Sequence, residues 1–121
     1  MSSTPLKTAP AASSRRVAVR IIENILQCPC CRQSEYLHHS TIDVFERAED
    51  ATQCLHAHIN RGGVKTEVST GRDNPSMRRH GLSVELWCEN CEATSRLTLA
   101  QHKGTTIMEH FCIDPMHGGE L

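Results

Sequence analysis

The sequence predicts a small, mainly antiparallel β domain held together by a metal ion, with a short N-terminal helix and a disordered N-terminal tail. Two cysteine pairs with C-x-x-C spacing supply four thiolates, the ligand set of a closed tetrahedral zinc site. Short runs of alternating apolar and polar residues, separated by turn-forming residues, indicate strands. Only four of the 121 residues are aromatic, so the core is thin, and small domains with thin cores commonly need a metal or disulfide staple.

The N-terminal region divides into a tail and a short apolar segment. Residues 1–14 are rich in Ser, Thr, Ala and Pro, so we expect a disordered basic tail followed by a single domain over residues 15–121. The apolar residues within 17–26 recur at helical spacing and predict an amphipathic helix (Val17, Ile21, Ile25). A strand over the same β-branched residues is the alternative.

The middle of the chain predicts three strands. Residues 36–47 form the first, with a bulge where the alternation is imperfect. Residues 51–59 alternate well, so that two sets of side chains face opposite ways (Leu55, Ala57 and Ile59; Cys54, His56 and His58). A turn at 60–63 and a returning strand over 64–70 complete a hairpin. We interpret this hairpin, residues 51–70, as an insertion between the two cysteine pairs.

The last part of the chain predicts a loop and a three-stranded meander. Residues 71–81 contain strong turn formers and read as a loop. The meander strands are residues 82–87, 93–100 and 105–113, with a turn at Lys103-Gly104, and the residues after 113 are expected to fray.

The metal ligands are predicted to be the outer cysteines of each pair (Cys28, Cys31, Cys88, Cys91). Ligands at i and i+3 allow one tight turn to aim both sulfurs at one ion, and two such turns, or knuckles, make a zinc ribbon. We therefore expect a small zinc-ribbon-like fold with one structural Zn²⁺. A closed four-thiolate site has no open position, so it favours a folding role over metal catalysis.

The remaining cysteines and the histidines near them are weaker candidates. Cys30 fits a knuckle poorly by spacing and is expected to be a free thiol, and Cys112 to be a small buried hydrophobe. No catalytic pattern surrounds Cys54 or Cys112. A second metal on Cys54, His56 and His58 is one interpretation, but these side chains spread over about 13 Å of strand, which favours a polar solvent-facing surface.

Two polar loops are candidate binding surfaces. The 71–81 loop carries Arg72, Arg78, Arg79 and His80, which suit an acidic partner, although a solvated loop is the simpler interpretation. The 101–105 segment places His102 and Lys103 in a turn that suits a carboxylate or a phosphate, with a plain hairpin turn as the alternative.

Charge and composition limit the classes of function. The first 20 residues carry four basic residues and no acid, whereas the rest carry nine basic and 14 acidic residues, so the body offers no phosphate-gripping surface. No apolar run is long enough for a signal peptide or a membrane span, so we expect a cytoplasmic protein with no membrane contact. In the cytosol, paired C-x-x-C spacings favour a metal over disulfides.

The chain resembles a family of small zinc-ribbon proteins found in bacteria and in phages and other mobile elements. The resemblance covers about residues 28–110, and Arg32 departs from the glycine usual there. It rests on several segments taken together: Cys28-Pro29-Cys30-Cys31, Tyr36-Leu37-His38-His39, Val44-Phe45-Glu46-Arg47, Glu49-Asp50-Ala51, Asn74-Pro75-Ser76, Arg78-Arg79-His80-Gly81-Leu82, Trp87-Cys88-Glu89, Cys91, and Ala100-Gln101-His102-Lys103-Gly104-Thr105. The resemblance implies a metal-bound small β domain and no established reaction.

These observations favour a non-enzymatic, zinc-stabilised binding module with a protein partner. If a phage or mobile element encodes the chain, it could serve as an accessory protein or inhibit a host complex. The alternative is a nucleic-acid-binding accessory or regulatory protein that uses Arg15, Arg16, Arg20 and the 72–80 loop. A metal-dependent enzyme is the third and weakest reading. Sequence leaves the partner and the oligomeric state open.

Overall fold

The structure, a computed structural model, describes residues 18–33 and 35–114 and is mainly antiparallel β. The predicted disordered tail over 1–14 lies outside the described residues, as do the C-terminal residues after 114. The strands are β2 (Ile21–Ile22), β3 (Ile25–Leu26), β4 (Leu37–Glu46), β5 (Cys54–Asn60), β6 (Gly63–Ser69), β7 (Gly81–Cys88), β8 (Thr94–His102) and β9 (Thr105–Asp114).

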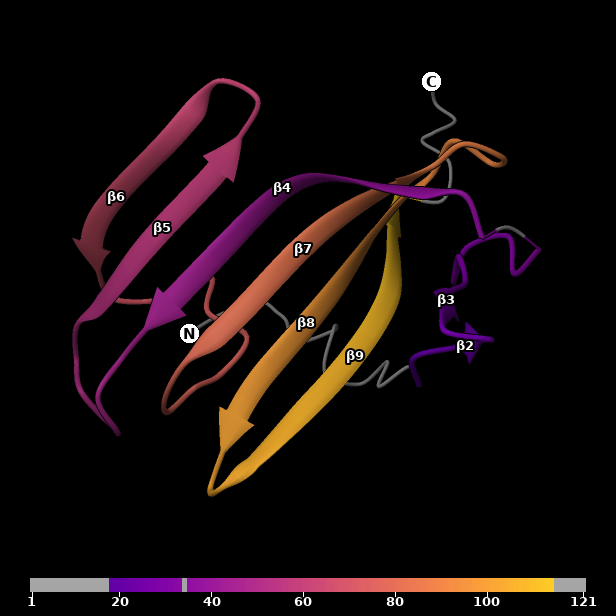
Figure 1. Cartoon of the computed structure of the whole chain (residues 1–121). Coiled ribbons are helices and arrows are strands. Elements are labelled where there is room, and N and C mark those ends of the chain that lie inside the picture. The colour runs from indigo at the N-terminus through magenta and orange to yellow at the C-terminus, as the bar shows by residue number, and fades with distance from the viewer. Residues whose placement is uncertain (1–17, 34, 115–121) are drawn as a thin grey trace.

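Six of these strands form one sheet in the order β6-β5-β4-β7-β8-β9. The hairpin of β5 and β6 lies on one side of β4, and the meander of β7, β8 and β9 lies on the other (Figure 1). The predicted hairpin and meander are confirmed. Because β4 and β7 are central neighbours, the hairpin between the two cysteine pairs extends the same sheet.

The predicted bulge in the first long strand is also confirmed. The register between β4 and β7 shifts between His39 and Thr41, and Ser40 is the extra residue. Beyond the shift, Leu37 pairs with Cys88, so β4 runs alongside β7 up to the second cysteine pair. The bulge therefore adjusts the register of the end of the sheet that meets the cysteine knuckles.

The predicted helix over 17–26 is wrong, and two short paired strands take its place. Ile21 pairs with Leu26, and Ile22 pairs with Ile25. The turn between them is made by Glu23 and Asn24, whose φ angles are 51° and 68°. A two-residue hairpin turn needs positive φ at both positions, and Asn adopts it readily. The β-branched residues that gave an apparent helical period therefore favour strands, and no helix occurs in the part of the chain that the structure describes.

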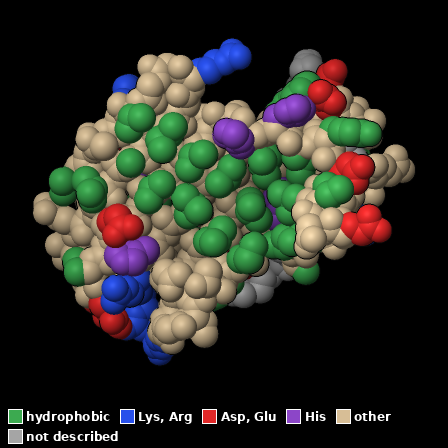
Figure 2. Space-filling model, in the orientation of Figure 1, with side chains coloured by type: hydrophobic (Ala, Val, Ile, Leu, Met, Phe, Trp, Pro, Cys, Tyr) green, Lys and Arg blue, Asp and Glu red, His purple; other side chains and the backbone are tan. Residues whose placement is uncertain are grey.

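The large sheet has one apolar face, which we define by the register and by the alternation of side chains. Its apolar residues include Ile42, Val44, Leu55, Ala57, Ile59, Val64, Val68, Leu82, Val84, Leu86, Leu97, Leu99 and Met108, and Glu46 lies on the same face opposite Leu55. Figure 2 shows hydrophobic side chains spread across the side of the sheet turned to the viewer. Several of them are open to solvent, with Leu55 50%, Val64 64% and Met108 45% exposed.

The opposite, polar face is the better covered one in the region of β4 and β5. Cys54 and Phe45 lie on it and are each only 1% exposed. The alternation predicted for residues 54–59 is confirmed, but the expectation that its polar side is the solvent side is wrong. His56, on the same side as Cys54, has a side chain only 14% exposed, and its ring stacks on Phe45 with 4.3 Å between centroids.

The 71–81 loop supplies part of this cover. Gly71, with φ of 76°, comes so close that an added Cβ would lie 3.1 Å from Cys54 Cβ. Asn74 holds the loop in shape, because its Nδ2 donates to the Arg79 carbonyl at 2.8 Å and its Oδ1 accepts from the Ser76 N–H at 2.9 Å. Gly81 has room only for hydrogen against Asn74 and Pro75. The loop is thus a packed element of the fold.

A disulfide bond joins Cys30 to Cys112, at the end of β9, with 5.2 Å between the two Cα atoms. The expectations of a free Cys30 thiol and of an unbonded Cys112 are therefore wrong. Sequence spacing could not reveal the pair, because 82 positions separate the two residues and only the fold brings them together. In a reducing cytosol this bond would open into two thiols, so its state reports on the compartment.

We predict that the double variant Cys30→Ser/Cys112→Ser unfolds more easily than the oxidised wild type. A cross-link closing so long a loop contributes about 2–4 kcal/mol by restricting the unfolded chain. The measurement is urea unfolding with and without a thiol reductant. The reductant should remove the difference between the two proteins, and equal stability under oxidising conditions would show that the bond contributes nothing.

His110 is a buried histidine in β9. It is 1% exposed, its Nε2 lies 2.9 Å from Ser95 Oγ, and its Nδ1 has no hydrogen-bond partner among the described residues. Burial lowers the pKa of His110 to about 4, because the imidazolium would lose its water. The ring is therefore neutral in the folded chain, whereas an unfolded chain protonates it below a pH of about 6.5.

We predict that this histidine makes the fold sensitive to acid. Its folded pKa is below its unfolded pKa, so its contribution is complete above pH ~6.5 and is lost as the pH falls toward ~4, at a total cost of ~3 kcal/mol. Unfolding free energy measured across this range should fall less steeply in His110→Leu than in the wild type. Parallel pH profiles would contradict the assignment.

Candidate metal centre

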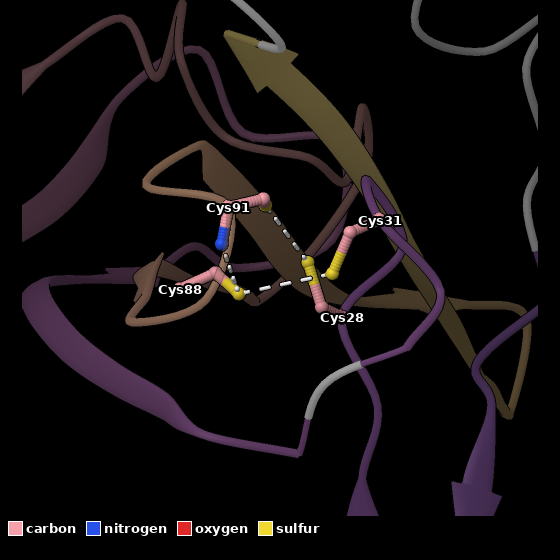
Figure 3. Close-up of side chains that lie close together, drawn as sticks. All are labelled: Cys28, Cys31, Cys88 and Cys91. Atoms are coloured by element: carbon pink, nitrogen blue, oxygen red, sulfur yellow. Dashed lines mark hydrogen bonds between the residues drawn. The ribbon is translucent and has the colours of Figure 1, made fainter.

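The fold brings the two cysteine pairs together at one end of the sheet. Cys28 and Cys31 follow β3, whereas Cys88 ends β7 and Cys91 lies in the turn before β8 (Figure 3). Cys28 Sγ lies 3.8 Å from Cys91 Sγ, and Cys31 Sγ lies 4.0 Å from Cys88 Sγ. All four sulfurs lie within 4.8 Å of one another and could hold a metal ion. The four predicted ligands therefore do converge.

Both knuckles use the same backbone turn. The Arg32 N–H donates to the Cys28 carbonyl at 3.1 Å, and the Glu92 N–H donates to the Cys88 carbonyl at 2.8 Å. Arg32 and Glu92 have φ angles of 59° and 61°, the left-handed region in which knuckles usually carry glycine. The missing glycines thus leave the turn geometry unchanged, and the two residues bear the conformational cost.

Hydrogen bonds to sulfur arise from these turns. The Cys30 N–H points to Cys28 Sγ at 3.3 Å, and the Cys91 N–H points to Cys88 Sγ at 3.4 Å. Asn90 Nδ2 donates to Cys31 Sγ at 3.6 Å, across from one knuckle to the other. Such donors spread thiolate charge and orient the ligands. Asn90 was not among the predicted site residues, although an amide inside a C-x-x-C pair is a usable signal.

The thiols have unequal acidities in this crowded site. Burial raises the pKa of Cys28, and burial together with neighbouring sulfurs raises the pKa of Cys91 to about 12. Burial also pushes the pKa of Cys31 upward, but hydrogen bonds from the Gln33 backbone and the Asn90 side chain bring it below the ordinary value. The Cys31 thiol is thus more acidic than those of Cys28 and Cys91, and a cation would have to displace the protons of these two.

The arrangement fits a tetrahedral ion. Ligands about 2.3 Å from a central ion, the length of a Zn–S bond, lie about 3.8 Å apart at the corners of a tetrahedron. The two measured sulfur pairs, at 3.8 and 4.0 Å, match this edge. Cys28 and Cys88 are 1% and 0% exposed, and four sulfurs complete the coordination. Such a site can hold the chain together but offers a substrate no free position.

The residues predicted for binding lie in two separate places. Arg78 contacts Glu49 Oε2 at 2.9 Å and Asp50 Oδ2 at 3.2 Å, and Arg79 lies 3.8 Å from Glu49. His80 Nδ1 accepts the Arg47 N–H at 3.1 Å.

The remaining predicted binding residues are more open. Arg72 is exposed and lines a pocket on the polar face. His102 and Lys103 are exposed at the turn between β8 and β9, where Lys103 has a φ of 49°. Of the basic residues in the 71–81 loop, Arg78 and Arg79 are thus paired with carboxylates of the same chain, whereas Arg72 is exposed.

A second group of metal-ligating side chains lies on the polar face. It consists of Asp43, His56 and His58, whose ligand atoms also lie within 4.8 Å of one another. The second metal site that was weighed from the sequence combined the two histidines with Cys54, but Cys54 is buried beside Gly71, where its sulfur faces Asn74 Nδ2 at 3.9 Å. Asp43, rather than Cys54, is the third residue of this group. Only the strand register, which sets Asp43 opposite His58, could have shown this.

Comparison of the chain with protein-family models, with curated proteins and with solved structures finds no match. The resemblance to small zinc-ribbon proteins of bacteria and phages therefore stays a prediction. Among the described residues, none belongs to a helix with the length and apolar character that crossing a bilayer demands.

We predict that Cys88→Ser loses the metal ion and most of the cooperative fold, because one missing ligand opens a clasp between distant parts of the chain. Metal content by mass spectrometry and a thermal melt check this prediction. The control is Cys54→Ser, which removes a buried cysteine outside the cluster and should keep one ion per chain. If the Cys88→Ser protein is as stable as the wild type, the four-cysteine site has no structural role.

Proposed function

We propose that this protein is a zinc-stabilised, non-enzymatic binding module of zinc-ribbon type that pairs with another protein through the apolar face of its sheet. Four cysteine sulfurs with tetrahedral spacing and no other ligand are typical of structural Zn²⁺. The closed coordination supports a folding role for that ion, and it leaves recognition to the surface of the sheet.

The observation that carries the proposal is the exposure of the apolar face. Leu55 is 50% and Val68 63% exposed, and they are direct cross-strand partners at one side of the sheet. Met108, which is 45% exposed, lies on β9 at the opposite edge of the sheet. Soluble monomers rarely expose apolar patches beyond a few hundred Å², and larger ones mark interaction sites. Exposure on this scale supports a partner that covers the face.

The size of the face suits a protein partner. Six strands about 4.8 Å apart and about 23 Å long have a footprint of roughly 550 Å², before the relief of the side chains is added. A standard protein interface buries about 800 Å² on each partner, and the smallest specific ones about 500 Å². The face is therefore comparable in size to a small protein interface and too flat for the enclosure that a small ligand needs.

The chemistry of the face defines the partner. Apolar side chains dominate this face, and Glu46, opposite Leu55, brings a charge to its margin, so a partner with many charges would lose their hydration with little compensation. A flat, apolar, uncharged surface such as the face of another β-sheet is complementary, since two sheets pack about 10 Å apart through interdigitating side chains. The ion pairs of Arg78 with Glu49 and Asp50 support placing the 71–81 loop outside a phosphate-binding role.

We predict that single lysines on this face weaken partner binding about tenfold or more, because each must be desolvated in an apolar contact. The variants are Leu55→Lys and Met108→Lys, whose exposed side chains leave room for the fold to persist. The matched control is Met77→Lys, which makes the same chemical change at a residue 86% exposed in the 71–81 loop.

The partner is identified by cross-linking the tagged chain in its native cells, and binding is then measured by calorimetry with the purified proteins. Met77→Lys should bind as the wild type does. A partner that binds the face variants and the control equally would overturn the proposal. If the purified wild-type chain sediments as a dimer and the Met108→Lys variant as a monomer, a second copy of the chain covers the apolar face instead.

A further inference from the structure

We propose that Asp43, His56 and His58 form a second metal site, which takes a divalent transition-metal ion and leaves part of its coordination shell open. This inference does not depend on the proposed function, because the site lies on the polar face of the sheet, away from the apolar face. Neither ligand set shares a residue with the other.

The strand register builds the cluster. His56 and His58 are two residues apart on β5, so both rings project from the same face. Asp43 on β4 is the direct cross-strand partner of His58. Its Oδ1 lies 2.7 Å from His56 Nε2 and 2.7 Å from His58 Nδ1, so one oxygen stands between two ring nitrogens. Three donors from two strands therefore point at one place.

The outer nitrogens of both rings also have polar neighbours. His56 Nδ1 lies 3.5 Å from Glu67 Oε2, and Glu67 is its cross-strand partner on β6. His58 Nε2 lies 3.3 Å from the side-chain amide of Asn60. Phe45 stacks flat on His56, with 17° between the ring planes, and fixes the orientation of that ring. Metal-binding histidines are typically supported in this way, by a carboxylate on the far nitrogen and by packing.

The three donor atoms are close to the spacing that metal coordination requires. An ion about 2.1 Å from each donor requires donors about 3.0–3.4 Å apart, so the two 2.7 Å contacts must open by less than 1 Å. The two ring nitrogens, which lie within 4.8 Å of each other, must reach the same spacing. Without an ion, the two rings donate N–H bonds to Asp43. With one, each ring would carry its proton on the outer nitrogen, His56 Nδ1 or His58 Nε2, so that the two inner nitrogens and the carboxylate would be free to ligate.

The donor set selects the class of ion. Two imidazoles and one carboxylate suit borderline divalent ions such as Zn²⁺, Fe²⁺ or Co²⁺, whereas Mg²⁺ and Ca²⁺ prefer sites made entirely of oxygen. Three protein ligands leave at least one position for water or a small ligand. A pocket of about 200 Å³ adjoins His56 and is lined also by Glu67, Arg72 and Asp73. The pocket therefore places a small polar space beside one of the three ligands, His56, whereas Asp43 and His58 are not among the residues that line it.

The test is a Co²⁺ titration of full-length protein whose cysteine site is already filled with Zn²⁺. We expect the wild type to bind one further equivalent, with the weak absorption of nitrogen and oxygen ligands and without sulfur charge transfer. Asp43→Asn and His58→Gln should each weaken this binding at least about tenfold, and Glu67→Gln, which touches only the far nitrogen of His56, by about tenfold.

The matched control is His38→Gln. His38, on β4 of the same sheet, also pairs with a carboxylate, with its Nε2 3.2 Å from Glu89 Oε2, but the described residues include no group of three metal-ligating side chains around it. It should leave the second equivalent intact. Imidazole nitrogen NMR of the wild type gives an independent reading, because diamagnetic Zn²⁺ should shift His56 Nε2 and His58 Nδ1. Absence of a second equivalent, unchanged imidazole signals, or equal binding by Asp43→Asn and His38→Gln would overturn the site.

Discussion

The convergence of four cysteine sulfurs at one end of the sheet is the constraint on which the rest of this structure depends. The cysteine pairs are separated by 56 residues, and everything between them, from β4 to β7, forms one long loop closed at the knuckles. Few apolar side chains are fully buried, so packing alone supplies little to hold that loop closed (Cys28, Phe45, Cys54, Leu86, Cys88, Ala93, Phe111). An ion bound at this point turns binding free energy, on the order of 10–16 kcal/mol for structural zinc, into folding free energy.

The distribution of polarity across the sheet follows from where the loops pack. Asn74 and Ser76 fold the 71–81 loop back against the polar face, so Cys54 and Phe45 are buried there. On the other face, Leu55, Val64 and Val68 are half or more exposed among the described residues. A domain of this size needs to bury apolar area to be stable, so exposed apolar side chains of this kind contribute little to it. A protein that covers this face, as proposed above, would bury them.

Much of the secondary structure could be predicted, because it depends on local signals. The hairpin of β5 and β6 follows from alternation and a glycine turn, and the meander from the same pattern repeated. The N-terminal segment was misjudged because Ile21, Ile22 and Ile25 satisfy a helical and a strand period equally. Only the positive φ of Glu23 and Asn24, which sequence does not reveal, decides for the hairpin.

The candidate sites differ in how much of them is local. Each cysteine knuckle is contained in four residues, so the ligands could be predicted and then found together. The Cys30–Cys112 bond and the placing of Asp43 between two histidines depend on strand register across the sheet. The solvent face of β5 was predicted wrongly because alternation says which side chains share a face, not which face a distant loop covers.

The knuckle turns and the thiol protons both set what a bound ion would have to offset. Arg32 and Glu92 both occupy left-handed backbone conformations, which cost an L-residue roughly 1–2 kcal/mol each. The pKa values of Cys28 and Cys91 are also raised, so these sulfurs stay protonated without a cation. As thiols they contribute no binding free energy that could offset the unfavourable backbone conformations. A tetrahedral ion would change both conditions at once, because it would deprotonate the thiols and bind them in the positions that these turns create. Glycine at these positions would ease the turns, but the free energy of one ion is large enough to hold them without it.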